Sequence, residues 1–234
     1  YGTANSNQLL MEMMGLHIPG SAFVPPSAEL RQLLTEYAVQ TAAGATALGE
    51  AFLPFYQVID ARSLVNGIVG LMATGGSTNL MIHIITMASA VGYVLTSQNL
   101  SDISQTTPLI ARIYPNGSDD VKQFHAAGGM AFVIRELLSA DLLHADAQTV
   151  IGRPISAYAQ EPSLAQGHLY WKDAPEQSGD TSILRPIGDA FSPQGGLCLL
   201  NGNIGEAVIK ISALDESKWA VQAPARVFDS QEAM

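Results

Sequence analysis

Apolar residues recur at intervals of three and four over much of the first 140 residues, and this spacing is typical of amphipathic helices. It predicts helices over residues 5–14, from a cap at Ser27 to Thr41, over 60–72, over 80–91 and over 130–140. Asn5 or Ser6 serves as the first N-cap, and Gly92 closes the fourth helix. Asp119 and Asp120 follow a Pro-Asn-Gly turn and predict the first turn of a further helix.

Short runs of β-branched and aromatic residues predict strands at 93–96 and 109–114. From about 154 to 179 the chain is rich in Pro, Ser, Gln and Gly and has little periodicity, which predicts a connecting loop. Further on, apolar runs at 196–200 and 207–212 flank Asn201-Gly202-Asn203 and predict a hairpin. We therefore expect one mostly helical α/β domain over residues 1–180, with a linker from about 155, and a β-rich domain over 181–234.

The composition excludes some classes of function. The chain has 234 residues, of which 47% are hydrophobic, and 21 acidic against 11 basic side chains give a net charge of −10. This balance argues against a nucleic-acid partner, because neutralising phosphates needs clustered Lys and Arg. No uninterrupted apolar run reaches the roughly 18–20 residues of a membrane span, so no membrane partner is expected. Tyr1 replaces an initiating Met and no signal-peptide pattern follows, so we expect a piece of a longer protein.

Cysteine and histidine usage narrows the chemistry further. Cys198 is the single cysteine and lies in an apolar strand pattern, so we expect a packed residue and a reducing, cytoplasmic setting. The histidines show no metal-binding spacing; they are His17, His83, His125, His144 and His168. His83 stands among isoleucines and is expected to be a core residue. The residues alone reveal no triad, redox pair or complete acid–base pair.

The sharpest local feature is a glycine-containing turn between two predicted helices, made of Gly75, Gly76, Ser77, Thr78 and Asn79. Two glycines let the backbone approach a ligand, and amides at a helix N-terminus can bind an anion. Spacing alone favours an ordinary turn capped by Ser77, because no Lys follows as in a P-loop. Residues 1–8 form a second stretch of small and amide side chains, which suits either a second polar wall or a capping sequence.

Several motifs together resemble the dihydroxy-acid and phosphogluconate dehydratase family. They are Tyr-Gly-Thr-Ala-Asn-Ser-Asn-Gln at 1–8, Ala-Thr-Gly-Gly-Ser-Thr-Asn at 73–79, Ile-Tyr-Pro-Asn-Gly at 113–117, Ala-Ala-Gly-Gly at 126–129 and Gly-Gly-Leu at 195–197. The likeness covers nearly the whole chain. The Ala-Asn-Ser-Asn-Gln and Ile-Tyr-Pro-Asn-Gly versions indicate the phosphogluconate branch.

The resemblance implies a fold and an activity. The fold is the helix-rich part of an N-terminal α/β dehydratase domain, followed by the start of a C-terminal swivelling β-barrel domain. The reaction is dehydration of 6-phospho-D-gluconate, a sugar-acid phosphate, to 2-dehydro-3-deoxy-6-phosphogluconate. An iron–sulfur cluster, expected as 4Fe-4S, acts there as Lewis acid on the C3 hydroxyl, and Mg²⁺ is left open as a further cofactor. Full-length members are expected to be homodimers.

The resemblance also places residues. It puts Gly75, Gly76, Ser77, Thr78 and Asn79 on the substrate side, and Asn5, Ser6 and Asn7 beside the cluster, after a ligand position. The cluster cysteines, the Cys-Asp-Lys element and the Asp-Gly-Arg-x-Ser-Gly segment with its serine base are missing from this chain. The catalytic residues are therefore expected outside it, and the fragment alone is expected to be inactive. Two alternatives stay open: a dihydroxy-acid dehydratase of branched-chain amino-acid synthesis, and a non-catalytic module of the same fold.

Overall fold

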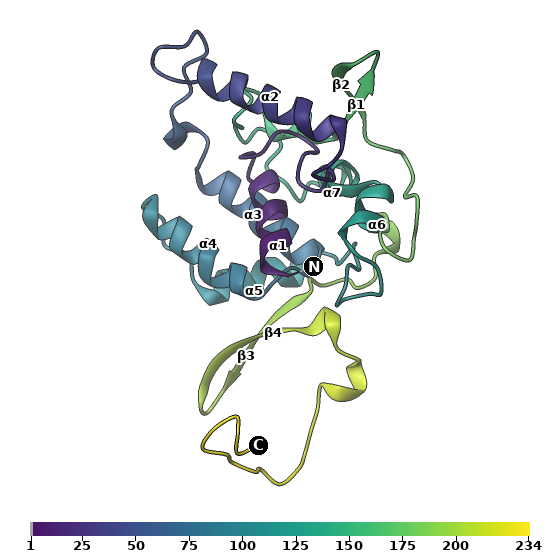
Figure 1. The fold of residues 1–234 in the computed structure, drawn as a ribbon. Coiled ribbons are helices and arrows are strands. Elements are labelled where there is room, and N and C mark those ends of the chain that lie inside the picture. Colours follow the sequence, from purple (N-terminus) through teal and green to yellow (C-terminus); the bar gives the residue numbers. More distant parts are fainter. Residues whose placement is uncertain (1) are drawn as a thin grey trace.

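Helices α1 (Thr3–Met13) and α3 (Ala61–Ala73) lie side by side in the middle of the helical body (Figure 1). The computed structural model describes residues 2–234, so Tyr1 of the N-terminal motif lies outside the described part. Two glycines permit the close approach: a Cβ at Gly70 would lie 2.4 Å from Met13 Cγ, and one at Gly67 would lie 2.7 Å from Met14 Cγ. The first predicted helix thus packs directly on the third.

Helix α1 divides the interior into two hydrophobic clusters. Leu9 and Met13 face a cluster shared with α6 (Val121–Ala126) and α7 (Gly129–Ser139). Leu10 and Met14 face a second cluster with α4 (Asn79–Ala90) and α5 (Ser97–Thr106). Helix α2 (Glu29–Gly44) lies apart from both and packs through Leu34 on a smaller, third cluster. The helices predicted from periodicity are confirmed, because each buries one apolar side in these clusters.

Capping side chains fix several helix starts. Asp60 forms a reciprocal capping box with Ser63 at the start of α3, and Asp120 does the same with Gln123 at α6. Thr96 caps α5 through Asn99, so the predicted strand at 93–96 is wrong. This short apolar stretch is a loop that enters an unpredicted helix, and no neighbouring strand pairs with it within residues 2–234.

The predicted strand at 109–114 is also wrong. Leu109 and Ala111 form isolated bridges to Ser192 and Leu184, without a continuous ladder. The apolar side chains of this segment are nonetheless buried, because Ile110, Ala111 and Ile113 belong to the cluster that contains α6 and α7 residues. His83 is exposed on α4, so its expected place in the core is wrong as well.

The predicted loop at 154–179 contains an antiparallel hairpin, β1 (Gln160–Ala165) and β2 (His168–Asp173). Its tight turn, Gln166-Gly167, has positive φ at both positions and lacks the usual Asn-Gly signal. Contacts from elsewhere hold it in place: Trp171 donates from Nε1 to the Pro19 carbonyl at 3.1 Å and packs in a tilted arrangement against Tyr37 of α2. The loop prediction is therefore corrected, for a reason that only tertiary packing reveals.

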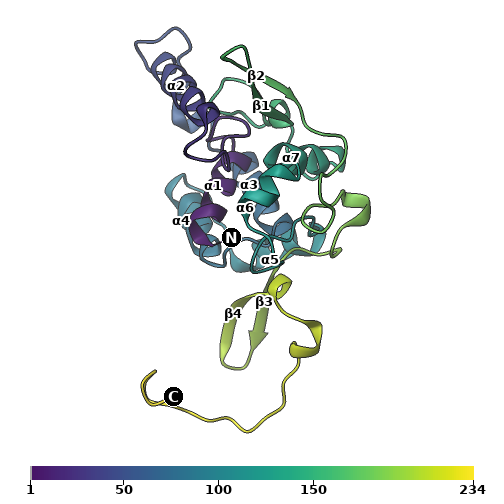
Figure 2. The same ribbon diagram turned by 45° about the vertical axis from the view of Figure 1, so that its right-hand side comes forward.

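The predicted second hairpin is confirmed as β3 (Leu197–Gly202) and β4 (Gly205–Lys210), paired antiparallel. It projects from the end of the helical body where α5 and the N-terminus lie (Figures 1 and 2). The fold is thus a mixture of helices and small antiparallel sheets, which is consistent with the expected α/β class. Residues 2–234 contain two two-stranded sheets and no closed barrel, so the barrel domain stays a prediction.

Replacing Tyr158 with phenylalanine is expected to destabilise the helical body by about 1–3 kcal/mol, because a part-buried carbonyl loses its hydrogen-bond donor. Tyr158 is fully buried, and its hydroxyl donates to the His17 carbonyl at 2.7 Å. The measurement is the thermal midpoint of the full-length protein. Tyr56, which is 75% exposed, provides the matched Tyr→Phe control; equal shifts in both variants would contradict the assignment.

Candidate functional site

The glycine turn (residues 75–79) joins α3 to α4 in a conformation that its two glycines make available. Gly75 has φ +57°, a left-handed value that glycine adopts without steric cost. Gly76 passes so close to the preceding helix that a Cβ there would lie 2.4 Å from Leu71 Cδ1. Both glycines are buried, so the chain reverses directly against the end of α3.

The N-terminus of α1 forms the second wall of the site. The Ser77 N–H donates to Ser6 Oγ at 2.9 Å. Thr3 Oγ1 lies 3.0 Å from Ser77 Oγ and accepts a 2.8 Å bond from Asn79 Nδ2. We call Thr3, Ser6, Ser77 and Asn79 the hydroxyl–amide cluster. Two motifs that stand out separately in the sequence, 71 residues apart at Ser6 and Ser77, are therefore in direct contact.

The backbone amides of the turn are largely used within the protein, as in the ordinary turn capped by Ser77 that spacing alone favours. The glycine N–H groups donate to carbonyls in the last turn of α3. Ser77 Oγ accepts from the Asn79 N–H at 3.3 Å, whereas Thr78, at the N-cap position, makes no side-chain capping bond. Ser77 therefore caps α4 and also belongs to the cluster. The groups offered to a ligand are side chains: Ser77 and Thr78 are half-buried and Asn79 is exposed.

The remaining residues of the N-terminal motif lie differently. Asn5 is half-buried and its Nδ2 lies 3.5 Å from Gln8 Oε1 on the same helix, while Asn7 is exposed. Ser6 is the predicted residue of this motif that contacts the turn. Thr3 was not among the predicted site residues, although its hydroxyl in the same Gly-Thr-Ala-Asn stretch is the signal that identifies it.

Asn116 is another residue that the site prediction did not select. It is 9% exposed, lies beneath the turn and donates from Nδ2 to the Gly75 carbonyl at 2.8 Å. It belongs to the Ile-Tyr-Pro-Asn-Gly motif on which the family resemblance partly rests. Spacing along the chain gives no indication that this motif meets the glycine turn; the contact is produced by the packing of the 109–116 segment on α3.

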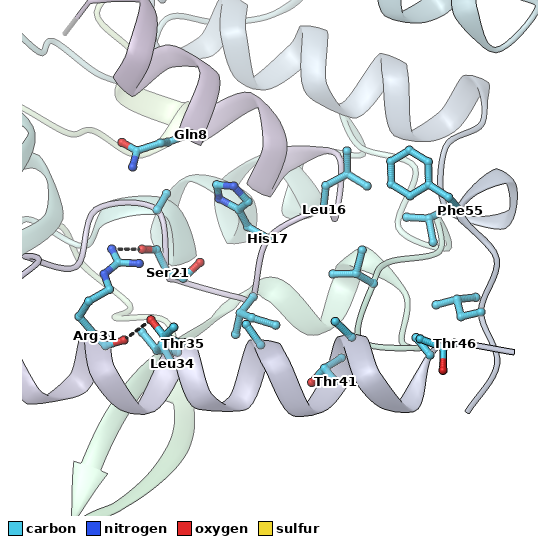
Figure 3. Close-up of a pocket in the computed structure, with 18 residues that line it drawn as sticks. Gln8, Leu16, His17, Ser21, Arg31, Leu34, Thr35, Thr41, Thr46 and Phe55 are labelled. Carbon is cyan, nitrogen blue, oxygen red and sulfur yellow. Dashed lines mark hydrogen bonds between the residues drawn. The ribbon is translucent and has the colours of Figure 1, made fainter. Parts of the chain in front are cut away.

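A separate pocket of about 580 Å³ lies between α2 and the loop that follows α1 (Figure 3). Gln8, His17, Ser21 and Arg31 gather at one end, and no residue of the glycine turn lines it. The Arg31 guanidinium donates to the carbonyls of Ser21 and Val24 at 2.7 and 2.6 Å. Burial lowers the pKa of His17, with a smaller effect from Arg31, so the imidazole is neutral at pH 7. The pocket offers mainly apolar surface.

Glu12 lies fully buried in the second half of α1. Its two carboxyl oxygens accept N–H bonds from Gly20 and Ala22 at 2.7 and 2.9 Å, which anchors the loop after α1. Burial raises the pKa of Glu12 to about 7, against the opposing effects of these two bonds and of the charge on Arg31. Glu12, which holds the loop beside the pocket, therefore changes its protonation state near neutral pH.

The donor set of the chain does not fit an iron–sulfur cluster. Cys198 is half-buried in β3, and its Sγ lies 3.6 Å from the Leu199 carbonyl. Within residues 2–234, no group of three or more His, Cys, Asp or Glu side chains is placed to hold a metal ion. We therefore derive no chemical step through such a group. Within the same range, no helix is both long and apolar enough to span a lipid bilayer.

Comparison with known proteins defines the class. The model of the dihydroxy-acid/6-phosphogluconate dehydratase N-terminal domain matches residues 1–158, and that of the C-terminal domain matches residues 182–234. The chain belongs to this dehydratase family, as the sequence motifs predict.

Particular relatives point to one branch. The chain is 51% identical over 232 residues to the phosphogluconate dehydratase of Rhizobium meliloti (strain 1021), covering 99% of this chain. It is 45% identical over 231 residues to the phosphogluconate dehydratase of Escherichia coli (strain K12), again over 99% of this chain. Identity to the dihydroxy-acid dehydratase of Sulfurisphaera tokodaii is 35% over 232 residues, 98% of this chain. The chain spans 38% of the first two relatives and 39% of the third.

Proposed function

We propose that a full-length enzyme containing this chain dehydrates 6-phospho-D-gluconate to 2-dehydro-3-deoxy-6-phosphogluconate. The observation that carries the proposal is the identity of 45–51% to phosphogluconate dehydratases over 99% of the chain, against 35% to a dihydroxy-acid dehydratase. The phosphogluconate and dihydroxy-acid dehydratases belong to one family, so the higher identity to the former bears on which substrate is used.

The reaction removes one molecule of water. The C2–H and C3–OH bonds break, an enol forms between C2 and C3, and its tautomerisation gives the 2-keto acid. We assign the base and the assistance to the departing hydroxyl to residues outside this chain. The same proposal includes an iron–sulfur cluster of the 4Fe-4S type, Mg²⁺ as a further ion, a homodimeric state and a cytoplasmic location. These parts of the proposal rest on the family resemblance.

Within this proposal, the glycine turn contributes to substrate binding. A sugar acid carries several hydroxyls and a carboxylate. The hydroxyl–amide cluster presents hydroxyl and amide groups, which can donate hydrogen bonds to such a ligand or accept them from it. Ser77 and Thr78 are half-buried, which lets them contact a ligand while their backbone stays fixed by α3 and α4. Ser6 fixes the turn from α1, and Asn5, Ser6 and Asn7 are proposed to lie beside the iron–sulfur cluster of the full-length enzyme.

Removing the hydroxyls of the turn tests this role. In the full-length enzyme, Ser77→Ala and Thr78→Ala are each expected to raise KM for 6-phosphogluconate about tenfold, the loss of roughly one hydrogen bond. Steady-state kinetics with each variant provides the measurement. Ser89, an exposed serine on the adjoining helix α4, provides the matched control Ser89→Ala. Unchanged KM values in both turn variants would place the substrate elsewhere.

The substrate assignment is tested on the intact protein, reconstituted anaerobically with iron and sulfide. It is offered 6-phosphogluconate and 2,3-dihydroxyisovalerate in parallel, and keto-acid formation is followed, with the 234-residue chain as an inactive control. Turnover of the phosphorylated acid alone supports the proposal. Preference for dihydroxyisovalerate would reassign the enzyme to amino-acid synthesis, and inactivity on both acids would favour a non-catalytic module.

A further inference from the structure

The side chain of Asn116 uses all of its hydrogen-bonding groups at one junction. Its Nδ2 donates to the carbonyls of Gly75 and Thr74, at 2.8 and 3.2 Å, and its Oδ1 lies 2.9 Å from Ser212 Oγ. An amide of this kind, with two donor hydrogens and one carbonyl oxygen, can bridge three partners at once. Asn116 thereby links the glycine turn to a residue 96 positions further along the chain.

Ser212 comes from the part of the chain that follows β4. Its Oγ lies 3.2 Å from the Gly196 carbonyl as well as near Asn116, and its backbone N–H also donates to Gly196. The Gly196 N–H in turn donates to the Met72 carbonyl at 3.0 Å, at the end of α3. A Cβ at Gly196 would lie 2.4 Å from Gly75 Cα, so the two backbones are in close contact.

The glycine turn needs such external support. Gly75 has a left-handed backbone and no side chain of its own, so apart from its N–H bond to the Met72 carbonyl its restraints come from other segments. Side chains from distant segments supply this support: Thr3 and Ser6 of α1 bond Ser77 and Asn79, Asn116 bonds the Gly75 carbonyl, and Ser212, after β4, bonds Asn116. Removing one of these links loosens the turn without removing apolar contacts from the core.

From this geometry we infer that Asn116 and Ser212 are positioning residues for the substrate site. They hold the glycine turn in the conformation that presents Ser77 and Thr78, and they make that conformation depend on the docking of the segment after residue 182. The region matched by the C-terminal family model thus acts on the site through the Ser212–Asn116 bond, beside the direct contact of Gly196 with Gly75. This inference rests on the proposed function, because it takes the turn as part of the substrate site.

The test uses the full-length reconstituted enzyme with Asn116→Ala, Ser212→Ala and the double variant. Two readouts are taken: hydrogen–deuterium exchange of the peptide covering residues 74–80, and the kinetic constants for 6-phosphogluconate. Asn201→Ala, an exposed asparagine on β3, is the matched control. Thermal midpoints and iron content are recorded for every variant, so that a misfolded protein is recognised.

Each single variant is expected to accelerate exchange in the turn and to raise KM about tenfold, with kcat within about twofold of wild type. The double variant is expected to resemble the single ones, because both residues belong to one relay and their effects do not add. Asn201→Ala is expected to match the wild type in both readouts.

Three results would overturn the inference: unchanged exchange in the turn, faster exchange with an unchanged KM, or single-variant effects on KM that simply add. A lower thermal midpoint with an unchanged KM would show a purely structural role. If wild type prefers dihydroxyisovalerate, the proposed function fails and the same comparison is made with that acid. If wild type acts on neither acid, the proposed function fails and this inference fails with it, whereas the exchange data still show whether Asn116 and Ser212 hold the turn.

Discussion

Gly75→Ala in the full-length enzyme is expected to lower kcat/KM for 6-phosphogluconate by about 100-fold, the effect of displacing a binding group by roughly 1 Å. A Cβ at Gly75 would lie 2.6 Å from Ser212 Oγ and 2.7 Å from Asn116 Nδ2, distances at which something must move. The left-handed φ of +57° adds about 1–2 kcal/mol of backbone strain for any residue with a Cβ. The turn is therefore expected to shift away from Asn116 and misplace Ser77.

Gly92→Ala is the matched control for this variant. Gly92 also has a positive φ, +87°, but a Cβ there meets nothing within 4 Å. It therefore reproduces the backbone strain without the steric conflict, and its kcat/KM is expected to remain close to wild type. Steady-state kinetics and thermal midpoints of both variants are the measurements. Equal loss of activity in the two would show that strain alone, and not contact with Asn116, explains the effect.

Because of Glu12, the free energy of unfolding is expected to fall as the pH rises from 4.5 to about 7. The pKa of Glu12 is raised above its ordinary value of 4.5, so the folded state binds a proton that the unfolded state has already released in this range. The stabilising contribution is complete below pH 4.5 and is lost as the pH rises through about 7. Its full size is roughly 3 kcal/mol.

Thermal or urea unfolding as a function of pH measures this effect. Glu12→Gln is expected to abolish the slope and to lower stability at acidic pH, because its amide nitrogen faces the N–H of Gly20 or Ala22 and cannot accept from it. Glu50→Gln, an exposed carboxylate on the protein surface, is expected to keep the wild-type slope. A Glu12→Gln protein that retains the slope would mean that another group titrates.

Helices with a continuous apolar side could be predicted from the sequence, because the apolar residues that recur at helical spacing are the same residues that pack in the core. Helix α3 is an example: its apolar residues face both hydrophobic clusters, and Asp60 provides a visible cap. Helix α5 escaped prediction because only Leu100 and Ile103 of its ten residues are large and apolar. Its start depends on Thr96 and Asn99, a pair that resembles many polar loops.

The first hairpin, β1–β2, shows why a loop prediction can fail. Pro162 and the Gln166-Gly167 turn are weak strand signals, and local preferences favour an irregular connection. The strands form because Trp171 packs on Tyr37 of α2 and donates to Pro19, contacts that span more than 100 residues of sequence. The second hairpin, by contrast, carries an Asn-Gly pair between two apolar runs and could be predicted locally.

The sequence by itself determined the main helices, the second hairpin, the family and the two motifs of the site, because each is encoded in local spacing or in a contiguous stretch of residues. The tertiary structure alone decided that Ser6 meets Ser77, that Thr3 joins them, and that Asn116 connects the turn to Ser212. These pairs form because α1 packs on α3 across two glycines and the chain then returns to the same end of the body. Which distant polar groups share a junction depends on that packing, and local sequence preferences do not specify it.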